Sequence, residues 1–399
     1  MNTPIHRPVA NAEAAAPAPR GLGSTLVLGL GTFAVGTDAY VVAGFLPGMA
    51  SSLHVSEGTA GQSATAFAIT YAVLSPVLAT VLARVPRRAL LVGALAVLAA
   101  ANLGSALAPD FATLMVSRVV AASGAAAFTP NAGAVAASLV APAQRARALA
   151  VVVGGLTVAT ALGVPLGSLA ARALTWHAAL ALVAALCAVA AAGVLAAMPA
   201  LPGAPRIPLR RRLAALRSPG VVAVLPLTVL GMAAGYGLYA YAVPVLRALG
   251  AGERAVPWLL FLYGAGAVAG NLVAGTRVDR HGPLRVQAVG YTALTVTLAL
   301  LTLASAAHTS WLPVAAVLMV AWGATTWFQT PAQQVRLINA APQETAVVVG
   351  LNASALYAGI GLGTVLGGAL LPRGATAALG TCTALAAVCL LHLLLTRRR

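Results

Sequence analysis

Two opposite charges lie deep inside apolar runs of the sequence. Asp38 is the only acidic residue well inside such a run, and Arg118 is the only arginine well inside one. At a helical rise of about 1.5 Å per residue, both lie roughly 10–12 Å from the outer end of their runs. Burial favours the neutral form of a carboxyl group, whereas an adjacent guanidinium favours the charged form. We therefore predict that Asp38 takes up and releases a proton beside Arg118. The alternative is a static ion pair that only orders helix packing.

The elements that position this pair are predicted to be membrane-spanning helices. Of the 399 residues, 60% are hydrophobic and only 8% are charged, and the mean hydropathy is +0.92. Because soluble domains carry about 25% charged residues, these values exclude a soluble enzyme, a nucleic-acid-binding protein and a disordered chain. A spanning helix needs about 20 apolar residues. Twelve such runs lie near residues 24–46, 59–83, 89–108, 111–140, 147–171, 177–198, 220–246, 255–277, 284–306, 311–339, 345–371 and 375–395.

The arginines between the runs predict the orientation. With the N-terminus inside, 19 arginines fall in inner segments and 4 in outer loops, so the positive-inside rule places both termini in the cytoplasm. The longest break divides the spans six and six. We expect an all-α membrane protein with 12 transmembrane helices in two pseudo-symmetric six-helix bundles. Its parts are a disordered cytoplasmic tail at 1–22, bundles at 23–198 and 220–396, and a cytoplasmic linker at 199–219.

The two halves carry related patterns. The end of span 2, at residues 79–88, is matched at residues 275–282, an offset of 196 residues. The Phe-Thr-Pro of span 4 at 128–130 is matched by the Gln-Thr-Pro of span 10 at 329–331. Parallel six-helix repeats place a substrate site between the halves, near the middle of the bilayer. The repeat therefore predicts a cargo site where the bundles meet.

Four motifs carry a resemblance to a known family. Span 4 reads R-x-x-x-x-x-G from Arg118 to Gly124, and segment 36–47 of span 1 reads G-T-D-A-Y-V-V-A-G-F-L-P. The loop after span 8 fits G-x-x-x-D-R-x-G-x-x-R through Gly275, Asp279, Arg280, Gly282 and Arg285. Span 5 carries a glycine and proline motif made of Gly155, Gly163, Pro165 and Gly167.

Together with twelve spans in two halves, these motifs resemble the major facilitator superfamily and its drug:proton antiporter branch. Segment 36–47 resembles the chloramphenicol-resistance and sugar-efflux subgroup. The resemblance implies export of a small solute in exchange for protons by alternating access. One departure is the loop after span 2, where the family's acidic residue would stand at Ala83.

The resemblance also implies roles for two of the motifs. Asp279, Arg280 and Arg285 are expected to form a latch that locks the outward-facing state; the alternative is a solvated helix end. The span-5 glycines, and those of span 11, are expected to let span 5 pack on span 8 and span 11 on span 2. The alternative is a generic tight contact. Pro165 is expected to bend span 5, because proline removes a backbone N–H.

Sparse polar and aromatic side chains inside the spans are candidates for the cargo site. Unsatisfied polar groups are costly in hydrocarbon, so these residues should face the interior. The alternative for each is a hydrogen bond between helices. We select five that lie in helices lining the cavity of the related transporters: Tyr40, Asn131, Tyr236, Tyr239 and Asn352.

The sequence carries no phosphate-binding loop, metal-ligand spacing or catalytic triad. We therefore expect no enzyme activity, no cofactor and no metal. The expected partners are a small-molecule substrate, protons and the lipid bilayer, with no nucleic acid, and the expected form is a monomer in the inner membrane. The leading prediction is proton-coupled efflux of a small amphipathic solute, such as a chloramphenicol-like antibiotic. One alternative is export of a sugar, nucleoside or amino-acid metabolite; the other is a sensor that transports nothing.

Overall fold

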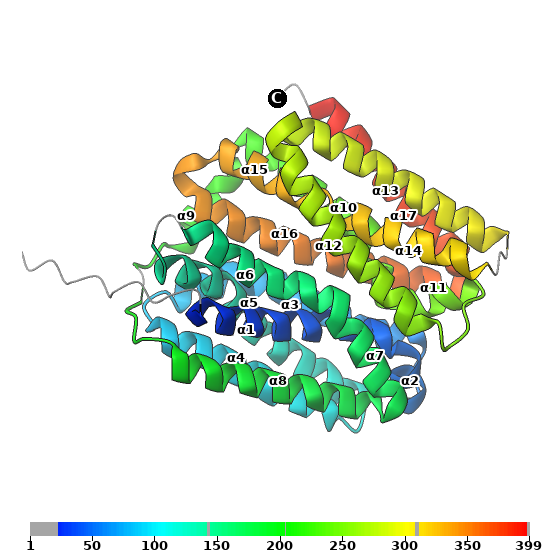
Figure 1. Cartoon of the computed structure of the whole chain (residues 1–399), viewed down its shortest axis with the longest axis horizontal. Coiled ribbons are helices and arrows are strands. Elements are labelled where there is room, and N and C mark those ends of the chain that lie inside the picture. The colour runs from blue at the N-terminus through cyan, green and yellow to red at the C-terminus, as the bar shows by residue number, and fades with distance from the viewer. Residues whose placement is uncertain (1–22, 142–143, 204, 308–310, 397–399) are drawn as a thin grey trace, which may run out of the picture.

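The computed structural model describes residues 23–141, 144–203, 205–307 and 311–396, and these are helical almost throughout (Figure 1). Within these ranges, twelve helical segments are long and apolar enough to cross a membrane, which confirms the predicted number. The expected tail at 1–22 lies outside the described residues.

The first six spans form one group of helices, coloured blue to green in Figure 1. Spans 1 and 5 are each built from three consecutive helical pieces. Span 1 consists of α1 (Gly23–Tyr40), the 3₁₀ turn η1 (Val41–Gly44) and α2 (Leu46–Ser52). Spans 2, 3 and 4 are the single helices α3 (Glu57–Val81), α4 (Arg87–Ala106) and α5 (Phe111–Ser138). Span 5 consists of α6 (Arg145–Val158), the π-helical turn η3 (Ala159–Gly163) and α7 (Val164–Ala173), and span 6 is α8 (Trp176–Ala197).

The second six spans form the other group, after a linker that contains α9 (Leu209–Ala214) and the short turn η4 (Ala215–Arg217). Span 7 consists of α10 (Pro219–Tyr236), the 3₁₀ turn η5 (Tyr239–Tyr241) and α11 (Ala242–Ala248), and spans 8 and 9 are α12 (Val256–His281) and α13 (Pro283–Ala306). Span 10 consists of α14 (Leu312–Trp327) and α15 (Thr330–Ala340), and the turn η6 (Pro342–Glu344) follows it. Span 11 is α16 (Thr345–Leu370), followed by the turn η7 (Leu371–Arg373), and span 12 is α17 (Ala375–Thr396). We call the end of the molecule that carries α9 the linker end, and the end that carries α2 and α11 the far end (Figure 1).

Polar caps begin three of the spans at the far end. Ser56 accepts the Thr59 N–H at 3.0 Å before α3, and Thr175 accepts the Ala178 N–H at 3.1 Å before α8. Asp110 accepts the Thr113 N–H at 2.8 Å before α5, and this backbone hydrogen bond lowers the pKa of the Asp110 carboxyl. Each cap satisfies one of the N–H groups that a helix start leaves without a partner.

Spans 1 and 7 are broken at matching places. The first helix of span 1 ends at Tyr40 and the first helix of span 7 ends at Tyr236, which is 196 residues later, the offset of the sequence repeat. In both spans a 3₁₀ turn follows the break and a short helix completes the crossing. Discontinuous helices at corresponding positions of two repeats indicate where a transporter binds its cargo.

Span 5 is distorted where Pro165 was expected to bend it. The π-helical turn η3 ends two residues before Pro165. The proline has no N–H to continue the ladder of hydrogen bonds, and the wider turn accommodates this gap. The turn also faces the second bundle, because a Cβ added at Gly264 of α12 would collide with the backbone of Ala161.

The glycine motif serves a contact other than the expected one. Side chains added at Gly155, Gly163 or Gly167 would collide with α1 or η1 of the same bundle, at Thr32, Thr37 and Val41 respectively. The matching glycines of α16, at 359, 363 and 367, face span 7 in the same way. The expectation that these stripes hold span 5 to span 8 and span 11 to span 2 is therefore wrong. Those cross-bundle contacts exist, but they use other small residues, including Gly264, Gly361 and Gly368.

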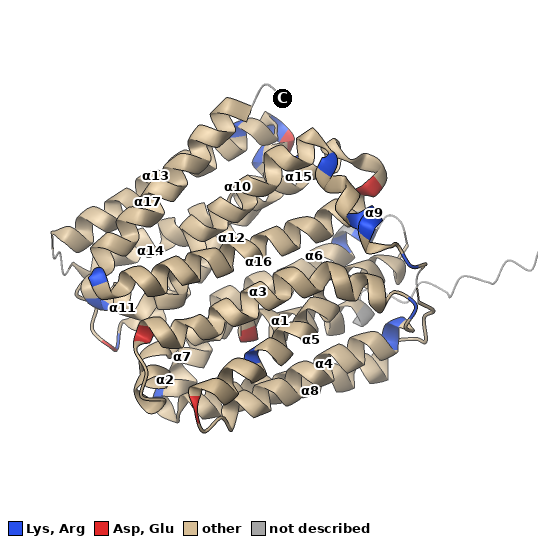
Figure 2. Ribbon diagram, turned by 180° about the vertical axis from the view of Figure 1, so that it is seen from behind, with Lys and Arg blue, Asp and Glu red and all other residues tan. Residues whose placement is uncertain are grey.

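Charge is confined to the two ends of the helices almost everywhere (Figure 2). The exception is the interior pair predicted from the sequence, Asp38 on α1 and Arg118 on α5, whose side chains are completely buried. The fold thus places one positive and one negative charge in the middle of an otherwise uncharged helical core.

Candidate functional site

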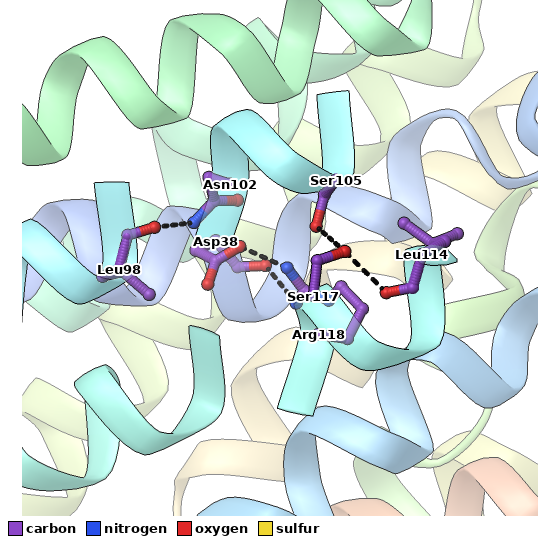
Figure 3. Close-up of polar contacts among 7 residues, drawn as sticks. All are labelled: Asp38, Leu98, Asn102, Ser105, Leu114, Ser117 and Arg118. Carbon is purple, nitrogen blue, oxygen red and sulfur yellow. Dashed lines mark hydrogen bonds and ion pairs between the residues drawn. The ribbon is translucent and has the colours of Figure 1, made fainter. Parts of the chain in front are cut away.

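Asp38 and Arg118 form an ion pair in the interior of the first bundle (Figure 3). The Arg118 Nη1 atom donates to Asp38 Oδ1 at 2.5 Å, and Nη2 donates to the Asp38 backbone carbonyl at 3.0 Å. The prediction from the sequence that Asp38 and Arg118 lie at the same depth, beside each other, is therefore confirmed. Because both side chains are fully buried, neither charge is hydrated, and each one depends on the other for its stabilisation.

The surroundings of the pair leave part of its hydrogen-bonding capacity unused. The Arg118 guanidinium lies 4.7 Å from the centre of the Phe67 ring, which is a cation–π contact. Asp38 Oδ2 and Arg118 Nε are buried and have no hydrogen-bond partner. Asn102 on α4 donates to the Leu98 carbonyl at 3.0 Å, while its own Oδ1 is also buried without a partner. A carboxylate with one free oxygen has a place to receive a proton.

Side chains from spans 4 and 10 cap the two broken helices. In the first bundle, Arg118 of span 4 binds the Asp38 carbonyl two residues before α1 ends. In the second bundle, Trp322 of span 10 donates its indole N–H to the Gly235 carbonyl at 2.7 Å, one residue before α10 ends. Thr326 donates to the same carbonyl at 3.2 Å. The two halves therefore satisfy corresponding helix ends with different chemistry, charged in the first and neutral in the second.

A cluster of aromatic rings joins the two bundles at the level of these breaks. Tyr40 of the first bundle lies 5.1 Å, centroid to centroid, from Tyr236 and 6.4 Å from Trp327 of the second. Tyr239 lies 5.1 Å from Tyr236 and stacks on Tyr263 at 4.1 Å. The structure thus brings together three of the five residues selected as cargo contacts: Tyr40, Tyr236 and Tyr239.

The other two selected residues lie nearer the linker end and bind other helices. Asn131 Oδ1 accepts from the Arg87 guanidinium at 2.5 Å, which ties α5 to the start of α4. Asn352 Oδ1 accepts from the Thr228 hydroxyl at 2.8 Å, which ties α16 to α10. In this structure both amides therefore make interhelical hydrogen bonds, the alternative stated for them.

Sequence reasoning did not select several residues that the structure places at this site. Tyr263, Trp322 and Trp327 join the aromatic cluster, and Tyr71 of α3 stacks on Tyr357 of α16 at 3.8 Å across the bundle boundary. Asn102 was also missed, although an amide inside an apolar run was a usable signal.

Polar contacts close the far end between the bundles. Glu57 at the start of α3 pairs with Arg247 of α11 at 3.3 Å. Thr65 and Thr364 bond at 2.7 Å, and Arg172 donates to the Glu253 carbonyl. A cavity of about 470 Å³, lined in part by Arg172, Arg247 and Glu253, lies at this end. The far halves of α3 and α16 are therefore held against each other.

The residues expected to form the latch lie at the linker end. Asp279, Arg280 and Arg285 are exposed, and Asp279 takes part in no ion pair among the described residues. Gly282 has a φ of +78°, a conformation that residues with a side chain rarely adopt, and it turns the chain from α12 into α13. A Cβ added at Gly275 would meet no other atom within 4 Å.

Two bundles of membrane-spanning helices, broken helices that meet at their boundary and a buried ion pair define a membrane transporter of small molecules. In the part of the chain that the structure describes, no group of three His, Cys, Asp or Glu side chains could hold a metal. The chain belongs to the Major Facilitator Superfamily, whose family description matches residues 28–246 and 225–399. It is therefore a multi-pass transporter and not an enzyme.

Individual relatives agree with this assignment. The chain is 32% identical over 352 residues to the inner membrane transport protein YdhP of Escherichia coli K12, covering 88% of this chain and 89% of that protein. It is 31% identical to the uncharacterized MFS-type transporter YfhI of Bacillus subtilis, covering 86% of each. It is 36% identical over 268 residues to a chloramphenicol resistance protein of Streptomyces lividans, covering 66% of this chain and 68% of that protein.

A solved structure supports the fold. A bacterial homologue of the human lysosomal transporter Spinster, in an inward-facing and unoccupied conformation, matches with a TM-score of 0.69 and 17% identity, covering 93% of this chain and 94% of that one. The expected fold, two six-helix bundles of this superfamily, is thereby confirmed.

Proposed function

We propose that this transporter exports a small amphipathic solute in exchange for protons, by alternating access across the inner membrane with the linker end in the cytoplasm. The observation that carries the proposal is the fully buried Asp38–Arg118 pair. An ionisable residue inside a membrane helix is costly and is found where ions or protons move. Its free Oδ2 atom gives the coupling proton a place to bind.

Protonation of Asp38 has a direct route to the bundle boundary. A neutral carboxyl group loses most of its attraction for Arg118, which also holds the Asp38 carbonyl at the break of span 1. Tyr40 follows two residues later and contacts Tyr236 and Trp327 of the other bundle. A change in the Asp38–Arg118 contact therefore acts on the aromatic contact that must open when the bundles rock.

Two sets of contacts fit opposite states of the cycle. Glu57–Arg247 and Thr65–Thr364 close the far end in this structure, while Asp279 at the linker end forms no ion pair with any residue that the structure describes. An inward-facing transporter needs this combination, because the cytoplasmic side must be free to separate. In the outward-facing state we expect the latch of Asp279, Arg280 and Arg285 to form and the Glu57–Arg247 ion pair to break.

The proposed class of cargo is supported by a relative of this chain and not by the ion pair. The name of the Streptomyces lividans relative favours an antibiotic such as chloramphenicol. Relatives with similar motifs can carry different cargo, so a sugar, nucleoside or amino-acid metabolite is the alternative. A panel of drug-susceptibility tests in an efflux-deficient host distinguishes the two. A decrease in susceptibility supports a drug; no shift for any drug, with a metabolite accumulating on deletion, supports the alternative.

The proton coupling is tested with Asp38→Asn in proteoliposomes. The variant removes the titratable group and keeps the shape of the side chain. We expect insertion and cargo binding to persist, while uphill export driven by an imposed pH gradient is lost. Asp110→Asn is the matched control, because it removes an exposed acid at the far end and should keep pH-driven export.

Two outcomes contradict the proposal. If Asp38→Asn still concentrates cargo against a gradient at the normal rate, the ion pair is structural and the proton is carried elsewhere. If the unaltered protein shows no proton-dependent flux for any cargo that it binds, the sensor alternative holds.

A further inference from the structure

The aromatic cluster at the bundle boundary has an uncharged environment. Among the described spans, charged side chains other than Asp38 and Arg118 lie towards the helix ends (Figure 2). The opposite charges of Asp38 and Arg118, the charged pair in this interior, cancel, and their side chains are already in contact at 2.5 Å. A ligand that enters this region therefore meets no net charge.

Within the described part of the second bundle, no ion pair lies at this level. Where the first bundle uses a guanidinium to cap the break of span 1, the second uses the Trp322 indole and the Thr326 hydroxyl. From this bundle, the rings of Tyr236 and Trp327 contact Tyr40 across the boundary, and Tyr239 packs against Tyr236 behind them. Tyr357 of α16 stacks on Tyr71 of the first bundle. The second bundle thus contributes flat apolar surfaces and neutral dipoles.

Three hydrogen-bond donors in the cluster are buried without a partner, and these are the hydroxyls of Tyr239 and Tyr263 and the indole Nε1 of Trp327. The Tyr239 side chain is completely buried and its hydroxyl makes no hydrogen bond. The indole Nε1 of Trp327 is likewise buried and unpartnered. Both groups are costly to bury alone, and both would be satisfied by acceptor oxygens on a ligand. By contrast, the Tyr291 hydroxyl in the same bundle is already used, because it donates to the Leu227 carbonyl and accepts from Gln333.

We propose that the cargo is an uncharged molecule with a flat ring and acceptor oxygens, seated among Tyr40, Tyr236, Tyr239 and Trp327. This inference rests on the proposed export function and names its substrate class. Because Asp38 and Arg118 already neutralise each other, a cation or an anion at this site would bring in a charge without a partner. Buried unpaired charge is strongly disfavoured, whereas an uncharged ring keeps the region neutral.

The test is equilibrium binding of three probes that share one ring. These are 4-nitrobenzyl alcohol, 4-nitrobenzoate and 4-nitrobenzyltrimethylammonium, measured by equilibrium dialysis against the full chain in detergent. Quenching of tryptophan fluorescence by the nitro group reports contact, because two of the five tryptophans lie in the cluster. We expect the alcohol to bind at least about tenfold more tightly than either charged probe.

Variants locate the site. Tyr239→Phe keeps the ring and removes only its unpartnered hydroxyl, and it should weaken binding of the alcohol by about tenfold. Trp327→Phe removes the unpartnered indole donor and should weaken binding of the alcohol by a similar factor. Tyr291→Phe is the control, since its hydroxyl is fully used within the protein, and it should leave the dissociation constant unchanged. Circular dichroism and thermal midpoints confirm that each variant is folded.

The outcomes separate this inference from the proposed function. Tightest binding of the cationic or anionic probe overturns the inference, as does alcohol binding that is insensitive to both Tyr239→Phe and Trp327→Phe. Neither result affects proton coupling, which is read from the transport of Asp38→Asn. Conversely, selective binding of the alcohol by a protein without pH-driven flux keeps the inference and removes the export proposal.

Discussion

The buried ion pair predicts an asymmetric response to removing either partner. Asp38→Asn leaves a guanidinium in the core that stays charged at any working pH. Arg118→Met leaves a carboxylate, which can take up a proton and become neutral. The double variant Asp38→Asn/Arg118→Met leaves no charge at all. The order of stability in the four proteins therefore tests whether the core charges depend on each other.

The magnitude follows from the contacts. Breaking a buried ion pair by removing one partner costs about 3–5 kcal/mol, whereas replacing both partners is often neutral. In Asp38→Asn, Arg118 keeps the hydrogen bond to the residue-38 carbonyl and the stacking on Phe67 at 4.7 Å, so we expect about 3 kcal/mol, the lower limit. Arg118→Met should cost less than this below neutral pH, since the carboxyl group is then free to protonate. The double variant should recover most of the loss.

The chain contains its own reporter for the measurement. All three cysteines, Cys187, Cys382 and Cys389, are buried in the folded protein. A thiol-reactive dye that fluoresces on coupling therefore detects unfolding as detergent-solubilised protein is heated. Midpoints for the four proteins, recorded between pH 5 and pH 8, give the order of stability and its dependence on pH.

Additive losses would refute this reasoning. If the double variant is as unstable as the sum of the single variants, the two charges do not stabilise each other in the folded state. A loss in Arg118→Met that does not decrease at low pH would show that the Asp38 carboxyl cannot take up a proton when its partner is absent, and this would also remove the basis of the coupling proposal.

Three further predictions concern topology and the two ends of the molecule. A reporter fused after Arg399 should be cytoplasmic and one inserted at residues 51–58 periplasmic, as read by paired enzyme and fluorescent fusions; an external C-terminus would overturn the orientation. Asp279→Asn should slow transport while the dissociation constant of the cargo changes by no more than a few fold, because the change lies far from the aromatic cluster; a large loss of binding with normal state exchange would contradict the latch. Glu57→Gln removes an ion pair between the bundles whose members are about one-third to one-half exposed, so a loss of about 0.2–1 kcal/mol should raise the outward-open population no more than about fivefold in distance measurements between spin labels. Glu253→Gln is its control, since that pair lies within one bundle and should not shift the states.

Composition and spacing predicted much of the architecture for a physical reason. A membrane helix must satisfy its own backbone hydrogen bonds and present an apolar surface to the lipid. Each span therefore appears in the sequence as an apolar run of about 20 residues, which can be recognised without the structure. The depth of Asp38 and Arg118 was predictable in the same way, because a regular helix converts residue counts into distance. The glycine stripe was read less well: its spacing indicated close packing, but the spacing of Gly163 and Gly167 is the same whichever neighbour they face.

The sequence by itself determined the class of protein, the number of spans, the internal repeat and the charged pair. Only the tertiary structure decided which residues meet across the repeat. Tyr40 and Tyr236 are far apart in the chain, and their contact depends on two helix breaks that no local sequence pattern predicts. The same holds for Trp322, which replaces in the second bundle the capping role of Arg118 in the first. Hydrophobic run length is a property of one segment, whereas capping and ring contacts are properties of pairs of segments, and a pair is defined only once the bundles have packed.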